Sequence, residues 1–199
     1  MIDIQGTQRF HGHRCPGLAT GIRVAEVALR EIGPHSTDEE VVAIVETDNC
    51  AVDAIQYLTG CTFGKGNLIH RDYGKNVFTF VRRSDGKAIR ISARPDFGGK
   101  SDPREREIFD RMRADQPVSN EDRRYYEESR ERRIQTLLNA PLEALFDVRE
   151  VEIAMPEKAV ILASAICARC GEPTMASRVR TVDGQPYCIP CFEALAGQR

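Results

Sequence analysis

Apolar residues recur with two different periods in the first hundred residues, and the change of period predicts where helices and strands lie. From Pro16 to about Ile32 the apolar residues stand three or four positions apart, which predicts a helix that Gly33 and Pro34 bring to an end. The short β-branched run 41–45 lies between polar residues and predicts a buried strand.

A second helix and a series of strands are predicted after this first strand. The helix covers 51–58 and stops at Gly60, a residue suited to a helix end. The strands that follow are predicted from alternating and β-branched runs over 67–73, 77–83 and 87–93. Helix, strand, helix and then a strand meander predict an α+β core with a mixed sheet.

The segment 103–133 is dense in charge, with nine Arg and nine Asp or Glu. Because the signs balance, the pattern predicts two solvated helices, separated at Pro117 and supported by ion pairs four residues apart. Two more strands are predicted over 148–154 and 159–166. The second of these is either a final strand of the core or a lead into the C-terminal segment.

Length and composition limit the classes of protein that need to be considered. The 199 residues are 41% hydrophobic with a net charge of −2, which fits one core domain of about 150 residues and an appendage. The charge favours neither nucleic acid nor acidic membranes, no apolar run approaches a membrane span, and the first residues lack the regions of a signal peptide. We therefore expect a cytoplasmic protein, in which clustered cysteines indicate metal or redox chemistry.

Four of the seven cysteines form two Cys-x2-Cys pairs separated by seventeen residues, namely Cys167, Cys170, Cys188 and Cys191. Two such pairs supply a closed tetrahedral shell of thiolates, which suits one structural zinc ion and leaves no position for a substrate. A predicted hairpin between the pairs and a short helix after the second pair are typical of a treble-clef finger. Residues 166–199 have a net charge of +1, so nucleic-acid binding is not expected.

A second group of candidate ligands lies near the N-terminus. If residues 11–15 are extended, the side chains of His11, His13 and Cys15 alternate onto one face and can converge on one ion. Two imidazoles and a thiolate favour zinc or another borderline metal. The alternative is that the histidines belong to the core and that the thiol is buried and inert.

Cys50 lies where the predicted buried strand ends and the next helix begins, which is where α/β sheets tend to place ligand sites. It is a candidate thiolate ligand, or else a small buried residue at a helix start. Asp48 and Asp53 flank it as candidates for a general base or for a carboxylate that orients a ligand. The glycine-rich run 60–68 lacks the spacing of a nucleotide P-loop, and we expect at most a turn that lets backbone approach a ligand.

The motifs at 10–21, 48–56, 60–68 and 72–75 together resemble the FmdE-like family, named for a component of formylmethanofuran dehydrogenase. The resemblance implies a thioredoxin-like α+β core with a mixed five-stranded sheet, over 1–164, and a treble-clef zinc finger over 165–199. It also implies one pocket that holds zinc or another transition metal and is built from His11, His13, Cys15 and Cys50. Cys50, His13, Asp48 and Asp53 are then the catalytic candidates, and Cys61 and Lys65 are candidates for cofactor binding at the rim.

Three functions follow as hypotheses from the residues and the resemblance. The first is a metal-dependent pocket that serves a molybdenum- or tungsten-dependent one-carbon redox system, with an unidentified small-molecule substrate. The second is a non-catalytic accessory or carrier protein that passes a metal or cofactor to a partner and docks through its finger. The third is a thiol redox protein in which Cys50 or Cys15 pairs with Cys61. The resemblance also makes a homodimer plausible, and whether the chain is an enzyme stays open.

Overall fold

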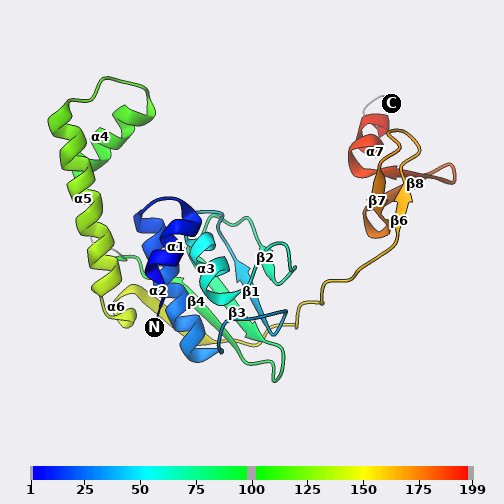
Figure 1. The fold of residues 1–199 in the computed structure, drawn as a ribbon, viewed down its shortest axis with the longest axis horizontal. Coiled ribbons are helices and arrows are strands. Elements are labelled where there is room, and N and C mark those ends of the chain that lie inside the picture. Colours follow the sequence, from blue (N-terminus) through cyan, green and yellow to red (C-terminus); the bar gives the residue numbers. More distant parts are fainter. Residues whose placement is uncertain (1, 98–101, 197–199) are drawn as a thin grey trace. The chain divides into compact units, whose positions relative to one another are not determined.

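The computed structural model describes residues 2–97 and 102–196, and the chain divides into two compact units, Met1–Lys158 and Ala159–Arg199 (Figure 1). The first unit is the core, and the second contains the two Cys-x2-Cys pairs. None of the described helices is both long and apolar enough to cross a membrane.

The core contains one mixed sheet of five strands in the order β2-β1-β3-β4-β5. Only β1 and β2 run parallel, and each of the other neighbouring pairs is antiparallel. The predicted mixed sheet is therefore confirmed. The strands are β1 (Val41–Val45), β2 (Leu68–His70), β3 (Val77–Arg82), β4 (Ala88–Ala93) and β5 (Phe146–Glu150).

Two predicted strands differ in extent from those in the sheet. The strand predicted over 67–73 is confined to 68–70, since only three of its residues pair with β1. The strand predicted over 148–154 begins at Phe146 and ends at Glu150, because its register places Phe146 opposite Ala93 and Glu150 opposite Ile89.

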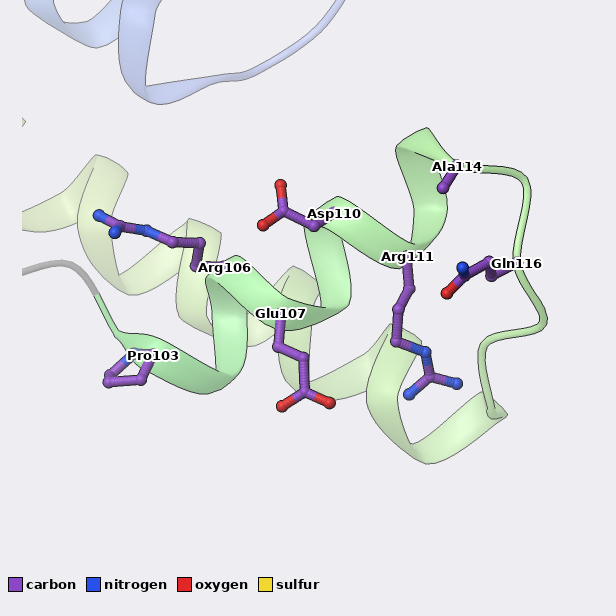
Figure 2. A pocket seen from close by; sticks show the side chains of 7 residues that line it. All are labelled: Pro103, Arg106, Glu107, Asp110, Arg111, Ala114 and Gln116. Carbon is purple, nitrogen blue, oxygen red and sulfur yellow. The ribbon is translucent and has the colours of Figure 1, made fainter.

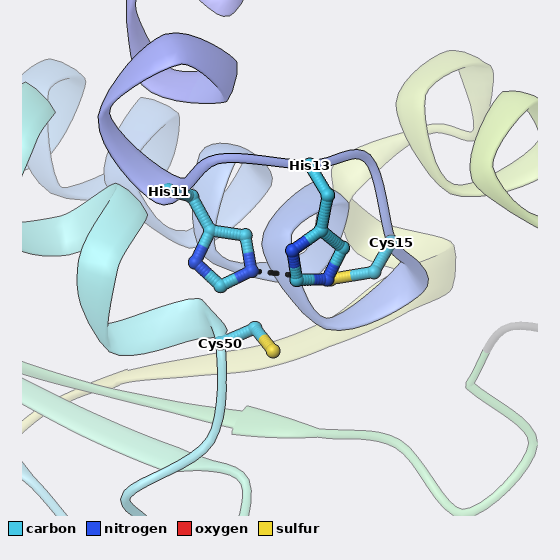
Figure 3. A group of neighbouring side chains, drawn as sticks. All are labelled: His11, His13, Cys15 and Cys50. Atoms are coloured by element: carbon cyan, nitrogen blue, oxygen red, sulfur yellow. Dashed lines mark hydrogen bonds between the residues drawn. The ribbon is translucent and has the colours of Figure 1, made fainter.

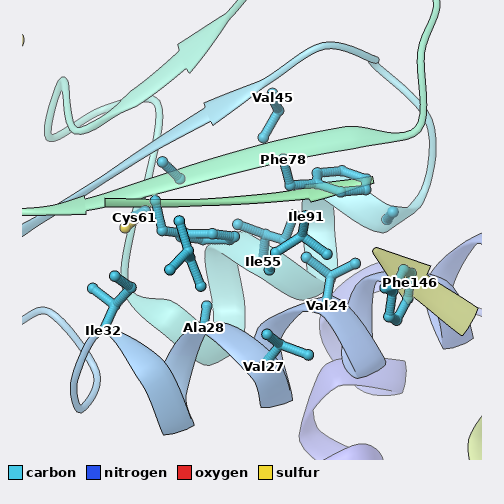
Figure 4. Packing of buried hydrophobic residues seen from close by; sticks show 14 of the residues in the cluster. Val24, Val27, Ala28, Ile32, Val45, Ile55, Cys61, Phe78, Ile91 and Phe146 are labelled. Carbon is cyan, nitrogen blue, oxygen red and sulfur yellow. The ribbon is translucent and has the colours of Figure 1, made fainter. Parts of the chain in front are cut away.

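Helices α2 (Pro16–Glu31) and α3 (Ala51–Thr59) pack against each other and cover one face of the sheet. Their apolar positions match the predicted periods: Val24 and Val27 of α2 meet Phe78 and Phe80 of β3 in one buried cluster (Figure 4). Close packing of carbon side chains at this density is the main source of the stability of the core. The core is therefore a two-layer structure with the predicted order of elements.

A short helix before these elements was not predicted. Helix α1 (Ile4–His11) contains mostly polar residues, and only Gly6 and Thr7 within it are buried. It begins because the Asp3 carboxylate accepts a hydrogen bond from the Gly6 amide at 2.8 Å, and it ends at Gly12, whose φ of 91° is left-handed.

The charged segment forms the two predicted helices, α4 (Pro103–Arg113) and α5 (Asn120–Asn139), and the short helix α6 (Leu142–Leu145) follows. Asp102 and Ser119 cap α4 and α5 with their side-chain oxygens. Helix α5 packs on α2 through its last turns, where Ile134 and Leu137 are buried. Elsewhere the two helices expose their charges.

The second unit is a small finger of two hairpins and a helix. Its elements are β6 (Ser164–Ile166), β7 (Pro173–Met175), a 3₁₀ turn (Ala176–Arg178), β8 (Val179–Val182), β9 (Gln185–Cys188) and α7 (Ile189–Ala196). Of the strand predicted over 159–166, only the last three residues form a strand. They pair with β7, so this strand belongs to the finger and is not a final strand of the core.

Candidate metal centres

Four side chains of the core converge on one point. One ligand atom from each of His11, His13, Cys15 and Cys50 can be chosen so that all four lie within 4.8 Å of one another (Figure 3). The Cys15 sulfur is 3.7 Å from His11 Nε2, and the two imidazole rings are 4.3 Å apart between centroids. Ligand atoms around a tetrahedral zinc ion are separated by roughly 3.3–3.8 Å, so this donor set fits a metal of that kind.

The predicted extended path through 11–15 is wrong, although the three side chains do converge. His11 is the last residue of α1, and left-handed Gly12 turns the chain so that Cys15 reaches the N-cap of α2. There the Cys15 sulfur accepts a hydrogen bond from the Leu18 amide at 3.2 Å. A helix end and a helix start, rather than one face of a strand, therefore position these ligands.

Cys50 precedes α3 at the end of the loop after β1, and glycines in α2 allow the two helices to bring it close. A Cβ on Gly17 would lie 3.2 Å from the Cys50 Cβ, and one on Gly21 would lie 2.2 Å from the Ala51 carbonyl oxygen. A side chain at Gly21 would push α3 away from α2. These glycines are needed for the site although they bind nothing, and their spacing of four residues on one helix face was the available signal in the sequence.

Asp53 holds His11 in place. Its Oδ2 lies 2.6 Å from His11 Nδ1, and the His11 side chain is only 9% exposed. With the proton on Nδ1 shared with this carboxylate, the lone pair of Nε2 points toward the cluster, which is the arrangement usual for metal-binding histidines. Asp48 is exposed and contacts none of the four candidate ligands through a hydrogen bond within the described residues.

The metal-free cluster disfavours charge on its ligands. Burial, followed by the neighbouring Cys15, raises the pKa of the Cys50 thiol. Loss of surrounding water is the largest cause that lowers the pKa of His13, and the positive charges of His11 and Arg130 add to it. A cation bound among these groups would relieve both effects, because it favours a thiolate and a neutral imidazole.

A hollow of about 390 Å³ opens beside the cluster. Its lining combines Cys50 and His11 with the carboxylates of Asp48 and Asp53, and none of the described residues that line it is Lys or Arg. The other residues that line it are Val45, Thr47, Asn49, Val52, Gln56, Phe63, Leu68 and His70. A different hollow of about 540 Å³ lies along α4 and contains none of the predicted site residues (Figure 2).

Cys61 and Lys65 lie outside this hollow and make other contacts. Cys61 is fully buried, and its thiol donates to the Val41 carbonyl oxygen at 3.4 Å. The Lys65 ammonium donates to the carbonyl oxygens of Ser36 and Thr37 at 2.8 and 3.3 Å. Both side chains stabilise the glycine-rich turn, and the geometry does not support a place for them at the rim.

The finger brings together its four cysteines, whose sulfur atoms also lie within 4.8 Å of one another. The Cys167 sulfur accepts the Cys188 amide at 3.3 Å, and the Cys170 and Cys188 sulfurs are 3.9 Å apart. Backbone amides, first that of Cys170, lower the pKa of Cys167 to about 6, whereas hydrogen bonds from the neighbouring thiols, first Cys188, raise the pKa of Cys191 to about 12. Four sulfurs at this separation fit zinc, which binds such sets as thiolates.

Two known families match separate parts of the chain. Residues 10–147 match the family described as "FmdE, Molybdenum formylmethanofuran dehydrogenase operon". Residues 162–195 match the "Prokaryotic dksA/traR C4-type zinc finger". The second match covers the four finger cysteines, so the expectation of a zinc finger at the C-terminus is confirmed.

A curated relative and a solved structure agree with these matches. A probable S-adenosyl-L-methionine-binding protein of Archaeoglobus fulgidus is 37% identical over 190 residues, which is 92% of this chain and 50% of that protein. This chain thus spans about half the length of that relative. An FmdE-like protein of the tungsten formylmethanofuran dehydrogenase type, from Syntrophus aciditrophicus, has the same fold, with a TM-score of 0.61 at 21% identity, covering 96% of this chain and 90% of that one. The chain therefore belongs to the FmdE family and carries a C4-type zinc finger after its FmdE region.

Proposed function

We propose that the core cluster binds one zinc or other transition-metal ion and that the hollow beside it receives a small-molecule substrate. The observation that carries this proposal is the convergence of His11, His13, Cys15 and Cys50 within 4.8 Å at the edge of an open hollow. The ligands come from the end of α1, the loop after it and the starts of α2 and α3, so the fold itself assembles them. Protein interiors rarely gather such groups without a use for them.

The residues around the cluster divide the work of such a site. A bound metal ion would act as a Lewis acid that lowers the pKa of a group bound to it. Asp53 keeps a proton on His11 Nδ1 and fixes the direction of the ring. Asp48 presents an exposed carboxylate to the same hollow, where it can accept a proton from a bound substrate. The apolar side chains of Phe63 and Leu68 exclude water from part of the hollow.

The cellular setting is a further proposal and rests on the family alone. The family description refers to a molybdenum formylmethanofuran dehydrogenase operon, and the structural relative is named after a tungsten enzyme of that type. We propose that this chain serves such a one-carbon redox system, together with partner subunits. The S-adenosyl-L-methionine in the name of the Archaeoglobus protein is not carried over, since this chain matches half of that protein.

Several narrower expectations remain proposals. We propose a thioredoxin-like arrangement for the core, supported by the parallel β1 and β2 strands joined through α3 and followed by the β3–β4 hairpin. A homodimer, a cytoplasmic location and a count of two metal ions per chain are proposed on the family resemblance and the two clusters. The domain boundary near residue 164 is proposed beside the division by contacts at Lys158.

Metal content per chain tests the main proposal. We expect two ions per chain in protein purified without added metal, and one ion in Cys50→Ser and in Cys188→Ser, because each substitution removes a ligand from a different cluster. Elemental analysis combined with protease mapping of the finger distinguishes which ion is lost. One ion in the unaltered protein that persists in Cys50→Ser would contradict a metal site in the core.

A thiol redox function is favoured by one contact only. Cys15 and Cys50 are neighbours in the cluster, and Cys15 contributes to the raised pKa of Cys50. A pairing with Cys61 is not supported, since its thiol is fully buried against Val41. Mass mapping after mild oxidation of metal-free protein would reveal a Cys15–Cys50 disulfide if this function is correct, and two unmodified thiols would exclude it. A carrier function would instead require that the core metal exchange during dialysis.

A further inference from the structure

The four candidate ligands of the core cluster are held in place to different degrees. The Cys15 sulfur is buried and accepts the Leu18 amide, and the His11 ring is fixed by Asp53. Cys50 is half-buried and packs against Gly17 of α2. Each of these three ligands is therefore fixed by contacts that do not require a metal.

His13 lacks such contacts. Its side chain is exposed, and within residues 2–97 and 102–196 its ring makes no hydrogen bond or ion pair. It follows left-handed Gly12, where a Cβ would meet nothing within 4 Å, so the backbone beside it has room to move. Its main contact is the tilted packing of its ring on that of His11. Of the four ligands, His13 loses the fewest interactions if it turns away.

A positive side chain lies beside His13. Arg130 of α5 donates to the Arg14 carbonyl oxygen at 2.8 Å, which fixes the arginine next to the loop that carries the histidine. Its charge is close enough to contribute to the lowered pKa of His13. The guanidinium of Arg14 is already paired with Glu131 at 2.7 Å. Arg130 is thus the cation available to a ligand that would take the place of His13.

A second hollow on this side has the opposite charge to the hollow beside Cys50. It measures about 260 Å³, begins at Pro16 next to Cys15, and includes Arg130 in its lining. Its other lining residues are Glu105, Arg106, Phe109, Tyr126 and Arg133. Three guanidinium groups and one carboxylate line it, so it favours an anion, and the buried Arg133 Nε finds no hydrogen-bond partner among the described residues.

We infer that His13 is the exchangeable ligand of the core cluster, and that a small anionic donor entering beside Arg130 takes its place. This inference rests on the proposed metal site. In the exchange, the bond between the metal and the His13 nitrogen breaks while a bond to the anionic donor forms, and neither oxidation state nor proton count changes. His11, Cys15 and Cys50 stay bound, and Arg130 compensates the charge of the incoming donor.

Cobalt(II) substitution with two competing probes tests the inference on the full chain. Azide is the anionic probe and imidazole the uncharged one, and each is titrated while the visible cobalt bands are recorded. We expect azide to change the bands of the unaltered protein, and His13→Ala to keep its core cobalt and to bind both probes more tightly. His11→Ala, in contrast, should lose the core cobalt, because it removes a ligand fixed by Asp53. The finger, with four sulfurs, should not respond to either probe.

The role of Arg130 is separated from general effects of the helix by charge and by a control. Arg130→Gln should weaken azide binding roughly five-fold and leave imidazole binding unchanged, since only the anion interacts with the lost charge. Arg124→Gln is the matched control, because Arg124 lies on the same helix and pairs with Glu128 instead. It should alter neither probe.

Three results would overturn the inference. They are loss of core cobalt in His13→Ala as complete as in His11→Ala, an absence of any azide response in cobalt-loaded protein, or equal weakening of azide and imidazole in Arg130→Gln. A core that takes up no cobalt at all would instead contradict the proposed metal site, so the two failures are distinguishable.

Discussion

The core cluster and the finger cluster each gather four ligand atoms within 4.8 Å, but the protein around them differs. The core cluster lies beside 21 buried hydrophobic residues that form one continuous cluster under the sheet. In the finger, Cys167 is the one buried side chain among the described residues 159–196. The comparison indicates that the core folds without its metal and binds it afterwards, whereas in the finger the metal takes the place of a hydrophobic core.

Metal removal should show the largest difference between the two regions. A strong chelator should unfold the finger, because binding of a structural zinc ion supplies roughly 10–16 kcal/mol and little apolar burial remains without it. The core should stay folded. Amide chemical-shift dispersion, followed by NMR, should collapse for residues 159–196 and persist for the strands of the core.

Readdition of zinc is the control for this experiment, and it should restore the dispersed finger signals. The comparison would be broken if the core unfolded together with the finger, since this would mean that the metal at His11 and Cys50 is also required for folding.

A cavity in the core should produce the second largest effect and leave the finger untouched. Phe80 is fully buried in β3 against the helices, so Phe80→Ala should lower the free energy of unfolding of the core by about 3–5 kcal/mol. Phe63→Ala is the matched control, because the Phe63 side chain is 79% exposed, and it should change stability by less than about 0.5 kcal/mol. Thermal unfolding measures both, and a loss of finger zinc in Phe80→Ala would contradict the independence of the two regions.

Local patterns predicted most of the fold and the whole finger cluster. Cys167 and Cys170, like Cys188 and Cys191, are separated by two residues on tight turns, so each pair is set by sequence spacing. Helix α1 escaped prediction because it buries only two of its residues and has no apolar stripe of the usual period. The local pattern of 11–15 therefore suggested a strand where a helix ends.

The support around the core cluster could not be derived from local patterns, because it depends on contacts between distant elements. Asp53 meets His11 across 42 residues, and only the packing of α1 on α3 brings them together. Arg130 reaches the loop after α1 across 116 residues. The thiol of Cys61 looked available in the sequence, but the register of β1 against β2 and β3 buries it.

The orienting carboxylate should have an intermediate effect that is confined to the core cluster. Asp53→Ala should weaken metal binding in the core by about 10–100-fold, or roughly 1.4–2.7 kcal/mol, because the His11 ring loses the acceptor for its Nδ1 proton. Asp48→Ala is the matched control. It removes a carboxylate from the same hollow that makes no hydrogen bond to a ligand, and it should change affinity by less than about three-fold. Competition with a chromophoric chelator measures both affinities, and equal losses would show that charge in the hollow, rather than ring orientation, controls metal binding.

The smallest expected effect on folding, and the sharpest form of the comparison, comes from the same substitution made in both clusters. Cys15 and Cys167 each accept a backbone amide with their sulfur, from Leu18 and Cys188 respectively. Serine is a good N-cap, so Cys15→Ser should preserve the start of α2 and lower the stability of the core by less than about 1 kcal/mol while weakening its metal binding. Cys167→Ser should leave the finger unfolded, because serine does not replace a thiolate as a zinc ligand. If thermal unfolding shows that Cys15→Ser destabilises the core as severely as Cys167→Ser disrupts the finger, the core metal is structural too, and a substrate-binding role for that site loses its main support.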